Sequence, residues 1–199
     1  MNLKQYIEDA KRTESVLDAV TINPDFLGSV VQVMIASGNM LDQIKKHVFY
    51  NRDYDVDKLI NEFANIVLSL ETLKRVISET RESEVKLMPY PGEVKTGLNP
   101  RIFHSIVGIT TESVELLEAL SAESFDNVNF LEELGDVNWY QAIGIDEAGG
   151  DFEQILTTNI EKLKKRYPEK FTSQNAIERD LQGERELLDS NLSTSDSGC

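Results

Sequence analysis

Apolar residues recur at helical spacing along nearly the whole chain, which leaves few folds open to it. Turn-forming runs such as Asn23-Pro24-Asp25 and Tyr167-Pro168 interrupt the pattern. We expect helices near residues 3–20, 26–47, 56–78, 101–122, 127–145, 151–166 and 173–188. No alternation typical of strands reaches a useful length. The sequence therefore predicts an all-α fold, a bundle whose amphipathic helices bury their apolar faces against one another.

The chain has 199 residues, enough for one large domain or two small ones, and its pattern indicates two helical halves. We expect an N-terminal half at residues 1–79 and a connector with Pro and Gly breakers at residues 80–100. The second half should span residues 101–189. A tail at residues 190–199 is rich in Ser and Asp, so we expect it to be disordered.

A weak internal repeat relates the two halves. Glu112-x-x-Glu115-Leu116-Leu117 aligns with Ala36-x-x-Asn39-Met40-Leu41, and Glu133-Leu134-Gly135-Asp136-Val137 aligns with Glu62-Phe63-Ala64-Asn65-Ile66. In this alignment the first copy has lost three of the four carboxylates. It would then be a degenerate structural partner in a tandem pseudo-dimer with one active site. The alternative is that any two amphipathic helical hairpins look this similar.

The composition narrows the range of partners. A formal net charge of −15 disfavours a nucleic acid or an anionic membrane, although bound metal ions can still attract a nucleotide. The single cysteine, Cys199, rules out an intramolecular disulfide. The sequence has neither a signal-peptide pattern nor an apolar run near the ~18 residues that span a membrane. We therefore expect a cytoplasmic protein.

Two pairs of acids share one spacing. Glu112 and Glu115, like Glu133 and Asp136, are three residues apart, so each pair lies on one helix face. Four carboxylates from neighbouring helices suit a hard divalent cation, Mg²⁺ with Mn²⁺ as a substitute. One such pair among 35 acids is most simply solvated surface. The second pair favours a metal site because it borders an apolar seam, where unpaired burial would be costly.

Gly135 separates the two acids of the second pair. A glycine lowers helix propensity by roughly 1 kcal/mol relative to alanine. We therefore expect another helix or a ligand to approach the backbone closely at this position.

A polar series with positive charge follows one helix later. Asn159, Lys162 and Arg166 run beside an apolar stripe at helical spacing, and Lys and Arg neutralise phosphate oxygens. Ordinary surface charge, or pairing with neighbouring acids, is the alternative. Tyr140 and His104 are further candidates for substrate binding, although aromatic side chains at helical spacing are more often part of a core. Acids beside a basic series point to a phosphate-bearing substrate.

Three segments, in this order, resemble the MazG-type all-α nucleoside triphosphate pyrophosphohydrolases. Residues 111–116 match the ExxE helix, residues 131–140 the ExxD helix, and residues 159–168 the N-x-x-K-L-x-x-R-Y-P segment. The resemblance covers about residues 103–171 and departs at Thr111, where many members carry Glu. Residues 41–50 also resemble the family, which favours the repeat.

The resemblance implies metal-dependent hydrolysis of a nucleoside triphosphate, expected to be a dNTP, to the monophosphate and pyrophosphate. The candidate catalytic and metal-binding residues are Glu112, Glu115, Glu133 and Asp136, and the candidate substrate-binding residues are Asn159, Lys162, Arg166, Tyr140 and His104. Family members form dimers or tetramers, so a homodimer is one expected assembly. Two alternatives remain open: a hydrolase of a guanosine alarmone, and a non-catalytic acidic helical scaffold or DNA mimic.

Overall fold

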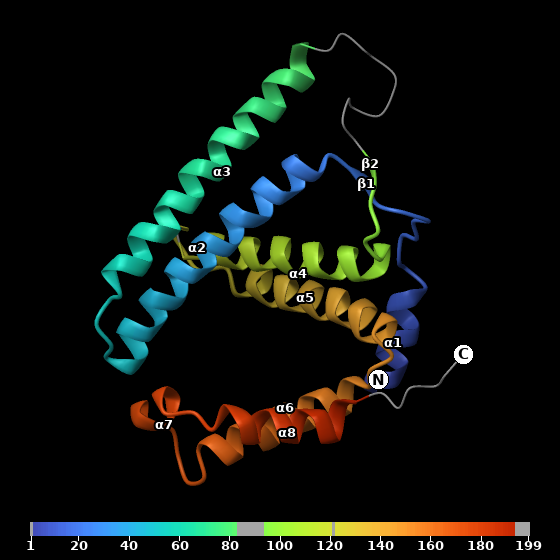
Figure 1. Cartoon of the computed structure of the whole chain (residues 1–199). Helices are drawn as coiled ribbons and strands as arrows, with labels where there is room; N and C mark the ends of the chain where they lie inside the picture. Colours follow the sequence, from blue (N-terminus) through green and yellow to red (C-terminus); the bar gives the residue numbers. More distant parts are fainter. Residues whose placement is uncertain (1, 83–93, 121, 194–199) are drawn as a thin grey trace. The chain divides into compact units, whose positions relative to one another are not determined.

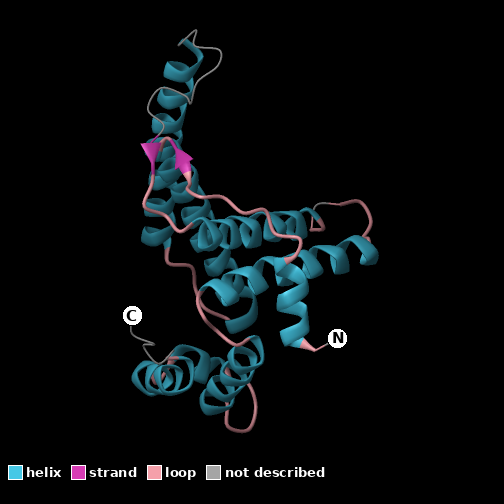
Figure 2. Cartoon of the chain, turned by 90° about the vertical axis from the view of Figure 1, so that its right-hand side faces the viewer, coloured by secondary structure: helices cyan, strands magenta, loops and turns pink. Residues whose placement is uncertain are grey.

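The structure of the chain is a computed structural model that describes residues 2–82, 94–120 and 122–193 (Figure 1). Within these ranges helices dominate, as Figure 2 shows by colour. The two strands have two residues each. The elements are α1 (Leu3–Lys11), β1 (Thr21–Ile22), α2 (Pro24–Tyr50), α3 (Val56–Glu82), β2 (Val94–Lys95), α4 (Pro100–Glu118), α5 (Asn127–Glu147), α6 (Phe152–Arg166), α7 (Ser173–Ile177) and α8 (Leu181–Leu192). The predicted all-α class is confirmed. No described helix combines the length and apolar character needed to cross a bilayer.

The chain divides into two compact units. Unit 1 consists of Met1–Val20 and Gly97–Cys199, and unit 2 consists of Thr21–Thr96. The sequence pattern had grouped residues 1–79 as one half, but α1 packs against α5 and α6 instead. The reason is tertiary, because Ile7 and Ala10 of α1 are buried in one apolar cluster with Ala142 and Phe152.

Unit 2 is built on a hairpin of two long helices, α2 and α3, which contact each other along much of their length. Asn23 caps α2, because its side-chain oxygen accepts from the backbone N–H groups of Asp25 and Phe26, and Pro24 takes the first helical position. The helix ends at Asn51, whose positive φ of 51° asparagine tolerates better than most residues. The strands β1 and β2 pair antiparallel in the same unit.

Unit 1 is built on a second hairpin, α4 and α5, whose helices lie side by side in Figure 1. Small residues allow their close approach. The Ser105 hydroxyl donates to the backbone oxygen of Tyr140 at 2.8 Å, and a Cβ added at Gly108 would overlap the Tyr140 ring. Elsewhere in the unit, α6 packs mainly against α8.

Several of the expected helix boundaries are wrong, and the largest differences lie near the two ends of the chain. The first helix ends at Lys11 and not at residue 20. Beyond it, Thr13 accepts a hydrogen bond from the Trp139 indole, and Glu14 binds Arg101, so tertiary contacts replace the next helical turns. The expected helix at residues 173–188 is two helices, because Asp180 begins α8 as its cap. Residues 190–192, assigned to the tail, are helical, and residues 194–199 lie outside the described residues.

Candidate functional site

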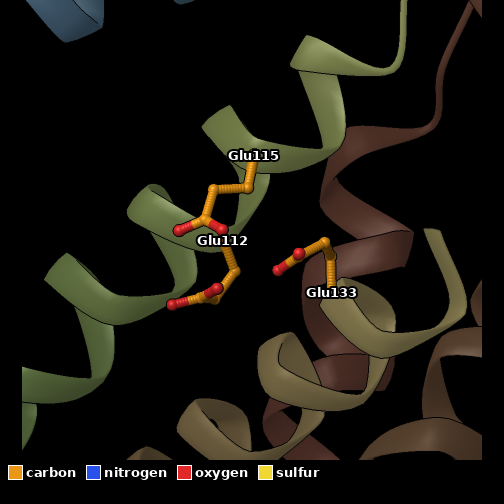
Figure 3. A group of neighbouring side chains, drawn as sticks. All are labelled: Glu112, Glu115 and Glu133. Atoms are coloured by element: carbon orange, nitrogen blue, oxygen red, sulfur yellow. The ribbon is translucent and has the colours of Figure 1, made fainter. Parts of the chain in front are cut away.

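Three carboxylates meet where α4 and α5 pack together. Glu112 and Glu115 are one turn apart on α4, and Glu133 extends from α5 toward them (Figure 3). One carboxylate oxygen from each residue lies within 4.8 Å of the other two. The i, i+3 spacing on α4 gathers two of these groups locally, and the packing of the hairpin supplies the third.

These three carboxylates lie close together and differ in burial. Glu133 is only 7% exposed, Glu112 is half-buried and Glu115 is exposed. Burial raises the pKa of Glu133, and the neighbouring carboxylates of Glu115 and Glu112 raise it further. In the described part of the chain, no Lys or Arg side chain forms an ion pair with any of the three. Such an arrangement favours a bound cation.

The donor set fits a hard divalent cation. All three groups offer carboxylate oxygens, the ligand type that Mg²⁺ and Mn²⁺ prefer. A buried carboxylate that faces two others loses free energy when all are ionised, and a bound cation would offset that cost. Glu112, Glu115 and Glu133 are therefore the residues that could hold a metal ion here.

Asp136, the fourth candidate, lies outside this group of three. Its side chain is exposed, and its negative charge acts on two tyrosines, Tyr140 and Tyr6. Gly135 also differs from expectation, because a Cβ built there meets no described atom within 4 Å. Tyr6 of α1 does reach the backbone here, since its hydroxyl donates to the Gly135 oxygen at 3.4 Å, but that contact does not require a glycine. Close approach of a ligand at Gly135 stays a prediction.

An aromatic group adjoins the carboxylates. The ring of His104 contacts Trp139 and Tyr140 edge-on, with centroid distances of 5.9 and 5.4 Å. Burial raises the pKa of Tyr140, and the charges of Glu112, Asp136 and Glu115 add to the shift. These side chains are thus partly packed against one another, as the sequence alternative allowed. His104 also lines a pocket of about 150 Å³ with Phe103. A pocket of that size is too small for a nucleotide.

The basic series on α6 has a different environment. Asn159 is exposed and Lys162 is half-buried, and neither belongs to the carboxylate group. Arg166 is bound by Glu184 of α8, with its Nε and a terminal nitrogen 2.8 and 2.7 Å from the two carboxylate oxygens. Arg179 binds the same carboxylate. Sequence reasoning missed Glu184, since nothing in its local pattern distinguishes it from the other acids of the chain.

Comparison with known proteins finds a family model that matches part of the chain. Residues 104–171 match the family model described as the MazG nucleotide pyrophosphohydrolase domain. No curated protein matches the chain. No solved structure matches it either. The matched segment contains the carboxylate group of α4 and α5 and the polar series of α6. Residues 104–171 are therefore similar to the MazG nucleotide pyrophosphohydrolase domain.

Proposed function

We propose that the chain hydrolyses a nucleoside triphosphate, with a dNTP as the expected substrate, to the monophosphate and pyrophosphate in the cytoplasm. The MazG-like domain supports nucleotide pyrophosphohydrolase chemistry. The observation that carries the proposal is the convergence of buried Glu133 with Glu112 and Glu115 in that domain. Mg²⁺ is the proposed cofactor, and Mn²⁺ is a proposed substitute.

Glu112, Glu115 and Glu133 would hold the divalent cation, and exposed Asp136 would complete the set when substrate is present. When bound, the cation supplies positive charge for the triphosphate oxygens and makes a nearby water molecule more acidic. The exposed position of Glu115 suits it to accept a proton from the attacking water.

The remaining residues would bind the substrate. Lys162 would neutralise phosphate oxygens, and Arg166 would do so through the terminal nitrogen that does not donate to Glu184. Asn159 would orient a phosphate or sugar oxygen. Tyr140 and His104 would contact the base or ribose. In the reaction, a water oxygen bonds to the α-phosphorus, the bond from that phosphorus to the α–β bridging oxygen breaks, and pyrophosphate leaves.

Pyrophosphate release from a panel of canonical and modified NTPs and dNTPs tests the proposal. Glu133→Gln should lower turnover about 100-fold or more, because one charged ligand becomes neutral. Glu132→Gln is the matched control, since Glu132 is the exposed neighbour on the same helix. Equal loss in both variants, or wild-type turnover in Glu133→Gln, would remove the assignment.

The same panel separates the alternatives. Guanosine alarmones belong in it, because a cation held by the three carboxylates would bind phosphate oxygens without selecting a base. Turnover confined to an alarmone would replace the dNTP assignment while keeping the site. If no substrate releases pyrophosphate and the protein does not bind Mn²⁺, the result would favour a non-catalytic acidic scaffold. The net charge of −15 agrees with such a role.

We also propose that the chain forms a homodimer. Large apolar side chains on the α4–α5 hairpin, among them Ile106 and Leu131, are more than half exposed. Exposed apolar surface of this kind is typical of a protein interface. Light scattering coupled to size exclusion should give twice the chain mass of 22.5 kDa. A constant monomer mass at high protein concentration would contradict the assembly.

A further inference from the structure

The two helical hairpins of the chain begin in the same way. Asn23 before α2 and Asn99 before α4 are both followed by proline at the first helical position. In each case the Asn side-chain oxygen accepts two backbone N–H groups, at 2.9 and 3.1 Å for both caps. A two-residue strand precedes each helix. Two unrelated amphipathic helices would not need the same cap residues with the same hydrogen bonds.

The correspondence continues into both helices. Six residues beyond each cap is a buried serine, Ser29 in α2 and Ser105 in α4. The same register places Ala36 and Asn39 of α2 where α4 has Glu112 and Glu115. A single register therefore relates the caps, the buried serines and the positions of the site.

The second helix of each hairpin also corresponds. Glu62 of α3 aligns with Glu133 of α5, and Asn65 of α3 aligns with Asp136. Glu133 faces two carboxylates, whereas one oxygen of Glu62 accepts from the Asn39 amide at 2.8 Å. The other oxygen accepts from the Asn65 amide at 3.5 Å. Both carboxylate oxygens of Glu62 thus accept from amide groups. These donors stabilise the carboxylate without a cation.

We propose that the α2–α3 hairpin is a second copy of the α4–α5 hairpin in which amide hydrogen bonds to Glu62 have replaced a metal ion. The chain then has one metal site, in unit 1, although it carries two hairpins of the same architecture. This inference relies on the metal assignment of the proposed function for its comparison. It adds that the α2–α3 hairpin has a structural role and binds no metal ion.

The chemistry of the substitutions supports this assignment. Changing a carboxylate to an amide at positions 39 and 65 removes two negative charges and adds donors for the remaining acid. Ala36, almost completely buried, removes the third charge and fills the space with a methyl group. Together these changes leave Glu62 as the one carboxylate at the four aligned positions and give it amide donors in place of a cation.

The test is the number of Mn²⁺ ions bound per chain, measured by titration calorimetry without nucleotide. The restoring variant carries Ala36→Glu and Asn39→Glu, which with Glu62 rebuild the counterpart of the Glu112, Glu115 and Glu133 group. The matched control carries Gln32→Glu and Ser78→Asp, which add the same charge at exposed positions of the α2–α3 hairpin. Circular dichroism checks that both variants keep their helix content.

We expect one bound ion in the wild-type chain and in the control, and two in the restoring variant. Glu62→Gln in the wild-type background should leave the number at one. A folded restoring variant that still binds one ion, or loss of Mn²⁺ in Glu62→Gln, would overturn the inference. If the restoring variant does not fold, Glu62→Gln decides alone. Glu133→Gln reports separately on the proposed function, because only the unit 1 site should disappear in it.

Discussion

Two glutamates of unit 1 are nearly equally buried and have opposite surroundings. Glu133 on α5 is 7% exposed and faces Glu112 and Glu115, whereas Glu184 on α8 is 4% exposed and binds Arg166 and Arg179. Burial, with the adjacent acids, raises the pKa of Glu133. The hydrogen bonds from the two arginines lower the pKa of Glu184 to about 2. One buried charge is compensated within the chain, and the other is left for a ligand.

The two regions are also held together by different forces. At the carboxylate group, like charges oppose the approach of α4 and α5, and close packing at Gly108 and Ser105 overcomes that repulsion. Between α6 and α8, the ion pair of Glu184 itself joins the helices. An uncompensated buried charge that packing holds in place is therefore the better indicator of a functional site.

Glu184→Gln should have the largest effect on stability among the variants that probe this comparison. It leaves two arginines without their shared counter-charge in a largely buried position, which costs about 2–4 kcal/mol. Urea unfolding followed by circular dichroism measures the loss. Glu186→Gln, an exposed change on the same helix, should cost less than about 0.5 kcal/mol. Similar costs for both would show that α6 and α8 do not depend on this ion pair.

The stability difference between the wild-type protein and Glu184→Gln should depend on pH. Because the folded pKa of Glu184 is lowered to about 2 from an ordinary value of 4.5, its stabilisation is fully present above pH 4.5. It is lost as the pH falls from 4.5 toward 2. The stability difference between wild type and Glu184→Gln should therefore be constant from pH 7 to 5 and shrink by pH 3. A difference that grows on acidification would contradict the ion-pair assignment.

Gly108→Ala tests the packing that holds the acidic group. The added methyl overlaps the Tyr140 ring, so α4 and α5 must shift, at a cost of about 1–3 kcal/mol. Gly135→Ala is the matched control, because its methyl meets open space and the change should stabilise α5 by roughly 0.5–1 kcal/mol. Thermal melts of both variants give the comparison. Stabilisation in both would mean that the hairpin is looser than its Gly108 contact implies.

Glu133→Gln in metal-free protein should give the smallest effect, with a sign opposite to that of Glu184→Gln. Neutralising one of three close acids relieves repulsion, and we expect a gain of about 1 kcal/mol. Melts in excess chelator measure it against Glu132→Gln, which should change stability little. A net loss of stability in Glu133→Gln would show that the carboxylates are already compensated without a cation.

Most of the helices were predictable because their signals are local. Apolar spacing predicts α2 and α4, and the Asn23-Pro24-Asp25 break marks the start of α2. The fit at α5 is within two residues, since 127–145 was expected and Asn127–Glu147 is observed. The expected 3–20 helix failed because Thr13 and Glu14 bind residues more than 80 positions away. No local pattern encodes such partners.

The candidate site was likewise predictable only where its signals are local. Spacing alone puts Glu112 and Glu115 on one face of α4, because helix geometry relates residues three apart. Glu133 and Asp136 share that spacing on α5, so sequence could not rank them, and the rotation of α5 against α4 buried Glu133 and left Asp136 exposed. Likewise, the basic series was visible in the chain, but the choice of Glu184 as the partner of Arg166 depended on how α8 packs. Helices form from neighbouring residues, whereas burial and ion pairing arise where distant segments meet.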